Sequence, residues 1–394
     1  MSQQEEFYRE RRLPPYVFAE VNRMKQAYRA EGRDVIDFGM GNPDLAPAPH
    51  IIAKLAEVAA DPRAHRYSAS QGVPSLRKAL ARYYDRRFNV GLNPDTEVCV
   101  TLGSKEGLAN LAQAITAPGD VILAPDPSYP IHMFGFLIAG AAVRPVGFKD
   151  PEDFLREAVH ACRRSIPAPS ALVLNFPSNP TAQVVDLDFY KEAVRIAKEN
   201  DLVLISDLAY SEIYFDGNPP PSILEVEGAR DVAVEFTSMS KTYSMPGWRM
   251  GFAAGSARLV DALKRVKSYL DYGAFTPIQI AAVAALDGPQ DHVAEARETY
   301  KKRRDVLVES FGRVGFHIPS PPATMFAWAP IPERFAHLGS VEFAKKLLEE
   351  TDVAVAPGLG FGERGDGHVR LAVVENEQRI RQAARALKGF FASE

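Results

Sequence analysis

The sequence has 394 residues, of which 46% are hydrophobic and 24% are charged, and its formal net charge is only -4. This balance is typical of a globular protein with a substantial core. It implies no broad attraction to nucleic acid or to an anionic membrane surface, so small molecules are the expected partners. The length allows two or three domains, or one large α/β unit with an appendage.

The cysteine and histidine content argues against disulfides and metals. Two cysteines, Cys99 and Cys162, are too few for a disulfide framework, and neither belongs to a CxxC pair. The eight histidines show no ligand spacing, so no metal site is expected. The stretch MSQQEEFYRERR lacks the apolar core of a secretory signal, and no apolar run reaches the ~18 residues that cross a bilayer. We therefore expect a cytoplasmic protein.

Residues 1–47 are polar and charged around LPPYVF, and they contain too little apolar material for a separate domain. We expect this N-terminal arm to wrap onto a small domain or onto a partner subunit, because neither its length nor its composition would support a core of its own.

Residues 48–290 alternate between short apolar runs and helix-like segments. Helix-like segments lie at 105–115 and 189–200. The apolar runs, which end in turn signals, are VCVTLG at 98–103, VILAPDP at 121–127, ALVLNFP at 171–177, LVLISD at 202–207 and VAVEFTS at 232–238. Uninterrupted Val, Ile and Leu runs are typical of a parallel sheet buried on both faces. The sequence predicts a large α/β domain over 48–290, with a mostly parallel sheet flanked by helices.

Residues 291–394 differ in character. Apolar residues keep helical spacing from Asp291 to Gly315, and the basic run KKRR at 301–304 is expected on the solvated helix face rather than in a nucleic-acid patch. Strand candidates TMFAWAP, VAVAPG and HVRLAVV then alternate with the helix-like SVEFAKKLLEE. We expect 1–47 and 291–394 to form a smaller α+β domain.

One glycine-rich stretch is a false lead. The letters GFGERG at 360–365 satisfy the G-x-G-x-x-G dinucleotide pattern, which requires a strand before it and a helix directly after it. The strand-like HVRLAVV follows instead, which favours a loop.

A better anion site is LGSKEG at 102–107, where a buried strand meets a helix. Its free N–H groups and the helix dipole would face an anion. Many such turns bind nothing, but Ser238 and Arg249 could add a hydroxyl and a guanidinium fork suited to a phosphate. Lys105 at the helix start suits solvent or phosphate contact, whereas Lys241 lies among hydroxyl side chains after a core strand. We assign covalent chemistry to Lys241.

Polar residues after the neighbouring strands could hold a heterocycle. Asp207 could either cap the next turn or hold the proton of a ring nitrogen. Tyr210 and Asn179 could donate to a phenolic oxygen, and the proline after Asn179 restricts the backbone that aims its amide. Arg370 lies in an apolar run and would be expensive to bury alone, so it pairs with a substrate carboxylate or forms a structural salt bridge. We favour the carboxylate.

Together these residues resemble the pyridoxal 5'-phosphate enzymes of the class I and II aminotransferase family, fold type I. The most specific stretch is SMSKTYSMPGWRMG at 238–251, which is similar to the family's lysine signature. NPT at 179–181, DLAY at 207–210 and the arginine of HVRLA fall in the family's order, and the resemblance covers essentially the whole chain. Within the family, GSKEGLANL, PSYPIH and FPSNPTAQ are similar to bacterial glutamate–pyruvate aminotransferases.

The resemblance implies pyridoxal 5'-phosphate as cofactor and assigns roles. Lys241 would bind the cofactor and move the substrate proton, Asp207 would keep the ring nitrogen protonated, and Tyr210 would complete the catalytic set. The cofactor contacts would be made by Ser104, Lys105, Tyr129, Asn179, Asp207, Tyr210, Ser238, Lys241, Arg249 and, from the neighbouring subunit, Tyr67. The substrate contacts would be made by Arg370, Gly41, Asn179 and Tyr16.

A homodimer with shared active sites is implied, which exchanges amino groups between L-amino acids and 2-oxo acids by a ping-pong mechanism. The expected reaction converts L-alanine and 2-oxoglutarate into pyruvate and L-glutamate. Three alternatives remain: another specificity (aspartate, LL-diaminopimelate or methionine), a pyridoxal-phosphate-dependent β-lyase, and a non-catalytic ligand-sensing module. Ammonia release instead of glutamate would indicate the lyase. A sensing module predicts decay of the catalytic set or an attached DNA-binding segment.

Overall fold

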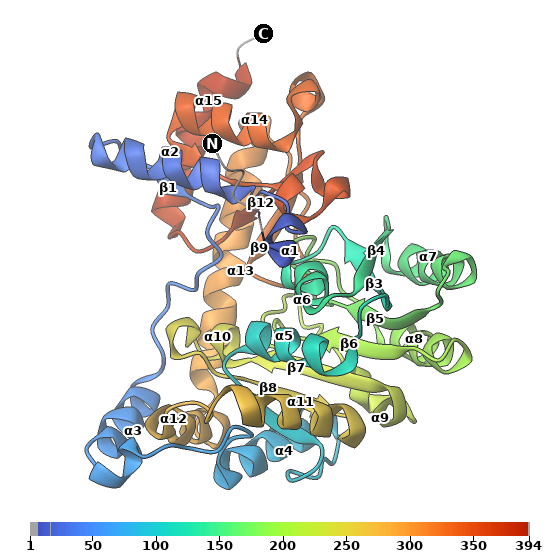
Figure 1. The fold of residues 1–394 in the computed structure, drawn as a ribbon. Coiled ribbons are helices and arrows are strands. Elements are labelled where there is room, and N and C mark those ends of the chain that lie inside the picture. The colour runs from blue at the N-terminus through green and yellow to red at the C-terminus, as the bar shows by residue number, and fades with distance from the viewer. Residues whose placement is uncertain (1–6, 16, 393–394) are drawn as a thin grey trace, which may run out of the picture.

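The computed structural model describes residues 7–15 and 17–392. A seven-stranded sheet covered by helices forms the lower part of Figure 1, and a three-stranded sheet packed on helices forms the upper part. Helix α13 (Asp291–Gly312) runs from one part to the other. A chain segment between β1 and α3 also crosses between them, on the left of the figure.

The large sheet has the strand order β2-β8-β7-β6-β5-β3-β4. Its strands are β2 (Val98–Thr101), β3 (Val121–Asp126), β4 (Ala142–Gly147), β5 (Pro169–Leu174), β6 (Val203–Asp207), β7 (Ala233–Ser238) and β8 (Gly251–Gly255). Only β8 pairs antiparallel with its neighbours β2 and β7, so the prediction of a mostly parallel sheet is confirmed. The sequence analysis did not predict β4 or β8, because AVRPVG and GFAAG lack the Val- and Ile-rich composition typical of strands.

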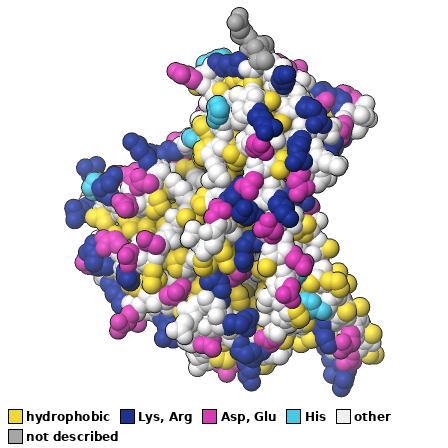
Figure 2. Space-filling model, turned by 180° about the vertical axis from the view of Figure 1, so that it is seen from behind, with side chains coloured by type: hydrophobic (Ala, Val, Ile, Leu, Met, Phe, Trp, Pro, Cys, Tyr) yellow, Lys and Arg dark blue, Asp and Glu magenta, His cyan; other side chains and the backbone are white. Residues whose placement is uncertain are grey.

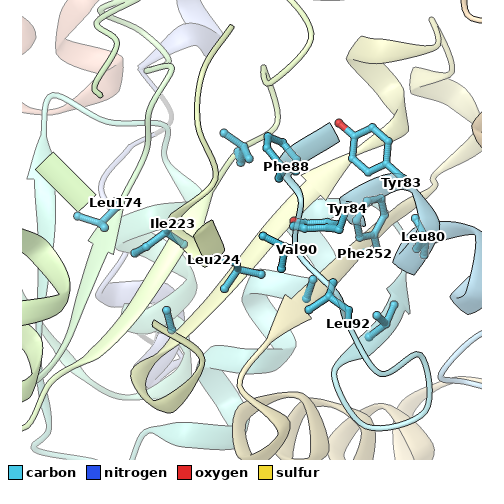
Figure 3. Close-up of a cluster of buried hydrophobic side chains, with 14 of the residues drawn as sticks. Leu80, Tyr83, Tyr84, Phe88, Val90, Leu92, Leu174, Ile223, Leu224 and Phe252 are labelled. Carbon is cyan, nitrogen blue, oxygen red and sulfur yellow. The ribbon is translucent and has the colours of Figure 1, made fainter. Parts of the chain in front are cut away.

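Both faces of this sheet are buried because successive side chains alternate between two cores. Leu172 and Leu174 of β5 belong to one cluster, whereas Ala171 and Val173 belong to the other. Figure 3 shows part of the first cluster, in which the rings of Tyr84 and Phe252 lie 6.1 Å apart. Each large apolar side chain that is fully buried contributes about 1.5–3 kcal/mol to stability.

Helices cover each face. The first core is closed by α4 (Pro74–Phe88), α7 (Pro151–Arg164), α8 (Leu187–Glu199) and α12 (Thr276–Asp287). The second core is closed by α5 (Ser104–Ile115), α6 (Ile131–Ala139) and α11 (Ala257–Leu270). The shorter helices α9 (Ala229–Val232) and α10 (Met239–Thr242) flank β7, and α3 (Pro49–Ala59) packs on α12.

A separate apolar cluster surrounds the second sheet, whose order is β11-β12-β9. Its elements, with the short pair β1–β10, are β1 (Ile36–Asp37), β9 (Phe326–Pro330), β10 (Val353–Ala354), β11 (Ala356–Pro357), β12 (His368–Ala372), α2 (Phe18–Ala30), α14 (Gly339–Thr351) and α15 (Glu377–Ala392). The stretch GFGERG forms two short 3-10 turns before β12 rather than a strand–helix junction. A loop was expected there.

One expectation requires correction, and one contact of the N-terminal arm was not expected. In KKRR, Lys302 is exposed, but Arg303 and Arg304 are buried with 6% and 5% of their surface accessible. They are not on the solvated face, because each makes an ion pair, with Asp44 and Asp216 respectively. The N-terminal arm also contacts the large part of the molecule, since Arg12, just after α1 (Tyr8–Arg11), donates to two carbonyl oxygens at the end of α6.

The surface in Figure 2 carries Lys and Arg side chains interspersed with Asp and Glu over the visible face. Within residues 7–15 and 17–392, every helix is too short or too polar to span a bilayer.

Candidate active site

A cavity of about 500 Å³ lies at the carboxyl ends of the large sheet's strands, where they face the small sheet. Ligands of open parallel sheets bind at this edge. The residues predicted from sequence that line it are Gly41, Ser104, Lys105, Tyr129, Asn179, Asp207, Tyr210, Ser238, Lys241, Arg249 and Arg370. The structure therefore brings together side chains from at least six separate segments.

One end of the cavity is built to hold an anion. Helix α5 begins at Ser104, so its first N–H groups, which lack intrahelical acceptors, face this end. Gly103 has φ +84°, and a Cβ there would lie 2.5 Å from Nη2 of Arg249. Arg249 is held by the carbonyl oxygens of Pro246 and Leu102 at 2.8 and 3.4 Å. Only glycine lets the guanidinium come this close to the turn.

Ser238 completes this end as the N-cap of α10, and its hydroxyl accepts from the backbone N–H of Ser240 at 3.1 Å. Ser240 lines the cavity as well, although the sequence analysis did not single it out. The short helix α10 also carries Lys241, so the anion site and the lysine share one rigid turn.

A buried lysine supports the anion turn from behind. Lys267 of α11 has no exposed surface and donates to Glu106 at 2.8 Å and to Asp271 at 2.9 Å. Glu106 in turn accepts from the backbone N–H of Leu102 at 2.8 Å. The sequence analysis did not single out Lys267, because its partner Glu106 lies on a distant segment, whereas Asp271 is four residues along the chain.

At the other end, Asp207 at the end of β6 is only 5% exposed. Its Oδ1 accepts from the N–H of Ala209 at 3.2 Å, so the simple turn-capping interpretation is also correct. Its Oδ2 lies 2.9 Å from Nε2 of His132, whose Nδ1 lies 2.6 Å from the hydroxyl of Ser128. A carboxylate only accepts hydrogen bonds, so the ring donates from Nε2 and accepts from Ser128.

Two asparagines connect Asp207 to the small sheet. Asn175 donates to the carbonyl oxygen of Asp207 at 3.0 Å and accepts from the N–H of Asn179 at 2.9 Å. Asn179 accepts at Oδ1 from Nη1 of Arg370 at 2.9 Å. The orientation of the Asn179 amide is therefore fixed by hydrogen bonds, in addition to the backbone restriction expected from the following proline. Asn175 directly follows β5, a position that could have identified it.

Arg370 of β12 is held between two aromatic rings. Its guanidinium carbon lies 4.0 Å from the ring centre of Phe326 and 4.6 Å from that of Phe361. It also donates to the carbonyl oxygen of Gly39 at 3.1 Å. A Cβ on Gly41 would lie 2.6 Å from the ring of Phe326, so glycine is required where this backbone crosses the ring.

Lys241 lies between the anion end and Arg370. Burial, together with the positive charges of Arg370 and Arg249, lowers the pKa of its amine from 10.5 to about 8. Its Nζ donates to the carbonyl oxygen of Gly41 at 3.1 Å. At pH 7 a minority of this amine is thus unprotonated and nucleophilic, but far more of it than a pKa of 10.5 would allow.

Tyr129 and Tyr210 bound the cavity on two sides. Burial raises the pKa of both hydroxyls, so they remain protonated donors at neutral pH. The ring of Tyr210 lies edge-on to Phe326 at 5.6 Å, and Lys105 lies 5.7 Å from the ring centre of Tyr129.

The family model for aminotransferase class I and II matches residues 33–387. The chain belongs to this family. It is 66% identical over 389 residues to a putative aminotransferase, AatC, of Rhizobium meliloti, covering 99% of this chain and 96% of that protein. It is 53% identical over 385 residues to the glutamate-pyruvate aminotransferase AlaC of Escherichia coli, covering 98% and 93%.

Further relatives of this aminotransferase differ in name. An LL-diaminopimelate aminotransferase of Dehalococcoides mccartyi is 42% identical over 378 residues, covering 96% of this chain and 97% of that protein. The substrate-bound structure of BacF from Bacillus subtilis superposes with a TM-score of 0.88 at 34% identity, covering 97% of each chain. The fold type I architecture expected from the sequence is thereby confirmed.

Aminotransferases of this family depend on pyridoxal 5'-phosphate, and the cavity fits that group. The cavity combines three features: an anion site that requires glycine at position 103, the buried carboxylate of Asp207 at the other end, and the amine of Lys241 with its lowered pKa. Bound there, the cofactor supplies an aldehyde that captures amines and a ring that withdraws electrons from the substrate.

Tyr67 and Tyr16 are the remaining predicted site residues. Tyr67 is 86% exposed, stacks against Tyr272 with ring centres 4.6 Å apart, and is not part of the lining of this chain's own cavity. Tyr16 lies outside the described residues, so its predicted contact with the substrate stays a prediction.

Proposed function

We propose that this aminotransferase exchanges the amino group between the pairs L-alanine/pyruvate and L-glutamate/2-oxoglutarate by a ping-pong mechanism. The observation that carries the proposal is the position of Lys241, between a phosphate-sized anion site and the guanidinium of Arg370. The name of the Escherichia coli relative at 53% identity supports the substrate pair.

We infer that Lys241 binds the cofactor covalently and later moves the proton at the substrate Cα. The lowered pKa of its amine supports both roles, since an unprotonated amine can attack an aldehyde and accept a proton. The carbonyl oxygen of Gly41 holds the amine at the substrate side of the cavity.

We assign Asp207 to the ring nitrogen of the cofactor, where its negative charge keeps that nitrogen protonated. His132 donates to Asp207 and, because the hydroxyl of Ser128 donates to its other nitrogen, is held in a single orientation. Asn179 turns its Oδ1 toward Arg370, which leaves its NH₂ group to donate to the phenolic oxygen, beside the Tyr210 hydroxyl.

The phosphate is assigned to the backbone of Ser104 and Lys105, the hydroxyl of Ser238 and the fork of Arg249. The supporting feature is their convergence on one end of the cavity. Tyr129 lines the same cavity and is assigned to the face of the ring.

Arg370 is proposed to bind the substrate α-carboxylate, which all the expected substrates share. The two rings against its guanidinium, together with its burial, shield the fork from water. The substrate side chain would then extend toward Phe18, Asn22 and Met40, which line the cavity on the small-domain side.

We further propose a homodimer with shared active sites. Exposed aromatic and aliphatic side chains cluster at 67 and 269–275, where Tyr67, Tyr269 and Tyr272 are 86%, 85% and 65% exposed. Contiguous apolar surface of this kind marks interaction sites. A second copy would bury it and bring Tyr67 toward the partner's phosphate site. Sedimentation of Tyr272→Asp should then show monomers; a dimer of unchanged stability would contradict the proposal.

We retain two other predictions as proposals. The domain division at 48–290 against 1–47 and 291–394 is supported by the separate apolar clusters around the two sheets. A cytoplasmic location is supported by the two free cysteines.

The substrate assignment is tested by incubating the purified enzyme with L-alanine and 2-oxoglutarate and measuring pyruvate and L-glutamate. LL-diaminopimelate, aspartate and methionine serve as alternative donors, and the first deserves inclusion because of the relative at 42% identity. A preference for one of these donors by tenfold or more in kcat/KM would overturn the alanine assignment. Release of ammonia without glutamate would indicate a β-lyase.

A further inference from the structure

The segment 39–44 crosses the mouth of the cavity and touches both principal groups of the site. The carbonyl oxygen of Gly39 accepts from Arg370 at 3.1 Å, and that of Gly41 accepts from Lys241 at 3.1 Å. The same segment presses Gly41 against the ring that supports the Arg370 guanidinium. A small displacement of this segment would therefore move the carboxylate-binding fork.

The segment is fixed at both ends. At its start, Phe38 is fully buried, donates to the carbonyl oxygen of Ala354 at 2.9 Å and accepts from the N–H of Ala372 at 2.7 Å. At its end, Asp44 is bound by both terminal nitrogens of Arg303, at 2.7 and 2.8 Å. The residues between these anchors have no strand partner that would hold them in register.

The anchor at Asp44 is a bidentate ion pair with a buried arginine. The side chain of Arg303 is 7% exposed and that of Asp44 is 37% exposed, and the contact is bidentate. Such fork-to-carboxylate pairs fix geometry as well as charge. Arg303 lies on α13, the helix that runs through both parts of the molecule, so it provides a rigid support.

We propose that Asp44 and Arg303 form a positioning pair that holds segment 39–44 against Arg370 and so sets the affinity for the substrate carboxylate. This inference rests on the proposed role of Arg370. Neither Asp44 nor Arg303 lines the cavity, so the pair acts through the Gly39 and Gly41 backbone. A displacement of about 1 Å at a reacting site can cost about 100-fold in rate, so a loose segment would be measurable.

The chain offers a matched control in the adjacent arginine. Arg304 is buried to the same degree and binds Asp216 at 2.9 Å and the adjacent Asp305 at 2.7 Å, and Asp216 is not among the residues that line the cavity. Asp44→Asn and Asp216→Asn each remove one carboxylate from a buried arginine, and Arg304 then keeps its ion pair with Asp305. Arg303→Lys and Arg304→Lys, which keep the charge and lose the fork, form a second matched set.

The experiment uses the cofactor-loaded enzyme. In Asp44→Asn, the KM values for L-alanine and 2-oxoglutarate should rise together by about tenfold, while kcat changes by less than about threefold. The dissociation constant of 2-methylalanine, which carries a carboxylate but no Cα hydrogen and cannot be turned over, should rise by the same factor in a titration of the visible absorbance. Arg303→Lys should raise the KM values and the dissociation constant by a smaller factor. The two controls, Asp216→Asn and Arg304→Lys, should leave the KM values and the dissociation constant unchanged.

Double variants separate positioning from general destabilisation. If Asp44 acts through Arg370, Asp44→Asn should add little to the loss already caused by Arg370→Lys. Equal effects of Asp44→Asn and Asp216→Asn, or a full additional loss in the Arg370→Lys background, would overturn the inference. An unchanged dissociation constant in Arg370→Lys alone would overturn the proposed role of Arg370, and with it the inference. A loss in Arg370→Lys without a loss in Asp44→Asn would overturn only the positioning pair.

Discussion

Arg370 donates from Nη1 to the side-chain oxygen of Asn179 at 2.9 Å. A guanidinium has no acceptor, so this contact determines which end of the amide faces Arg370 and leaves the NH₂ group directed elsewhere. One hydrogen bond thus connects Arg370 of the small sheet, the proposed substrate anchor, with Asn179, a proposed cofactor contact beside the large sheet.

Asn179→Asp should convert this contact into an ion pair that competes with the substrate. We expect the KM for both amino donors to rise at least about tenfold, because the α-carboxylate must displace a bound carboxylate from Arg370. Asn179→Ala removes the amide without adding charge and serves as the control. If steady-state kinetics gave equal KM values for the two variants, the competition would be absent.

The lowered pKa of Lys241 predicts how cofactor attachment depends on pH. Since the amine reacts when unprotonated, the rate at which the cofactor-free protein becomes yellow should rise with pH and level off above about 8 rather than near 10.5. Arg370→Met should move this midpoint upward, because one of the charges that lower the pKa is gone. Borohydride reduction followed by peptide mapping should place the cofactor on residue 241; a label on Lys105 would contradict the assignment.

The same shift affects stability, with a definite sign. Between pH 8 and 10.5 the unfolded chain binds a proton at Lys241 that the folded protein has lost, so the free energy of unfolding rises with pH across this window. Denaturant titrations of the cofactor-free protein should show this rise, and Lys241→Met should reduce it.

Gly103→Ala should weaken cofactor binding through Arg249. The added methyl would lie 2.5 Å from Nη2, so the fork must move away from the phosphate site, and the dissociation constant should rise at least about tenfold. Gly119→Ala is a matched control, because Gly119 has a similar φ of +98° but open space around its Cβ. Gly103 has φ +84° and ψ 159°, a region essentially restricted to glycine, so Gly103→Ala should also lower stability by about 1–3 kcal/mol. Only Gly103→Ala should change the affinity measured by fluorescence titration.

Asp207→Asn should separate chemistry from binding. The phosphate contacts remain intact, so the affinity for the cofactor should fall less than about fivefold, whereas kcat should fall about 100-fold or more. His132→Phe, which removes the donor to Asp207, should show an intermediate loss of kcat. Equal losses of affinity and rate in Asp207→Asn would contradict the electrostatic role.

The positions of Asp207, Lys241 and Arg249 could be found from the sequence. Asp207 ends the buried strand β6, and Lys241 and Arg249 lie in the segment that connects β7 to β8. The carboxyl ends of parallel strands meet at one edge, so residues there converge whatever the rest of the fold does. Arg370 could be identified for a different reason: it is a cation in an apolar run, where burial without a partner would be costly. His132 and Lys267 gave no such signal, because the partners that connect them to the site, Asp207 and Glu106, lie 75 and 161 positions away.

The basic run at 301–304 illustrates the limit of helical periodicity. Lys302 faces solvent as expected, but Arg303 and Arg304 are buried because Asp44 and Asp216 come from distant segments to neutralise them. The charge of Arg303 and Arg304 suggested that both side chains would be exposed, and only their ion pairs explain why both are buried.

The sequence by itself determined the α/β class, the edge of the sheet where ligands bind, and the residue types needed for cofactor chemistry. These follow from local patterns, namely strand composition, turn residues and the helix start after Gly103. Only the tertiary structure decided that Arg370 is held between two rings, that Asn179 turns its amide oxygen toward Arg370, and that Asp44 binds Arg303 beside the cavity. Such features depend on distances between residues far apart in the chain, which no local pattern encodes.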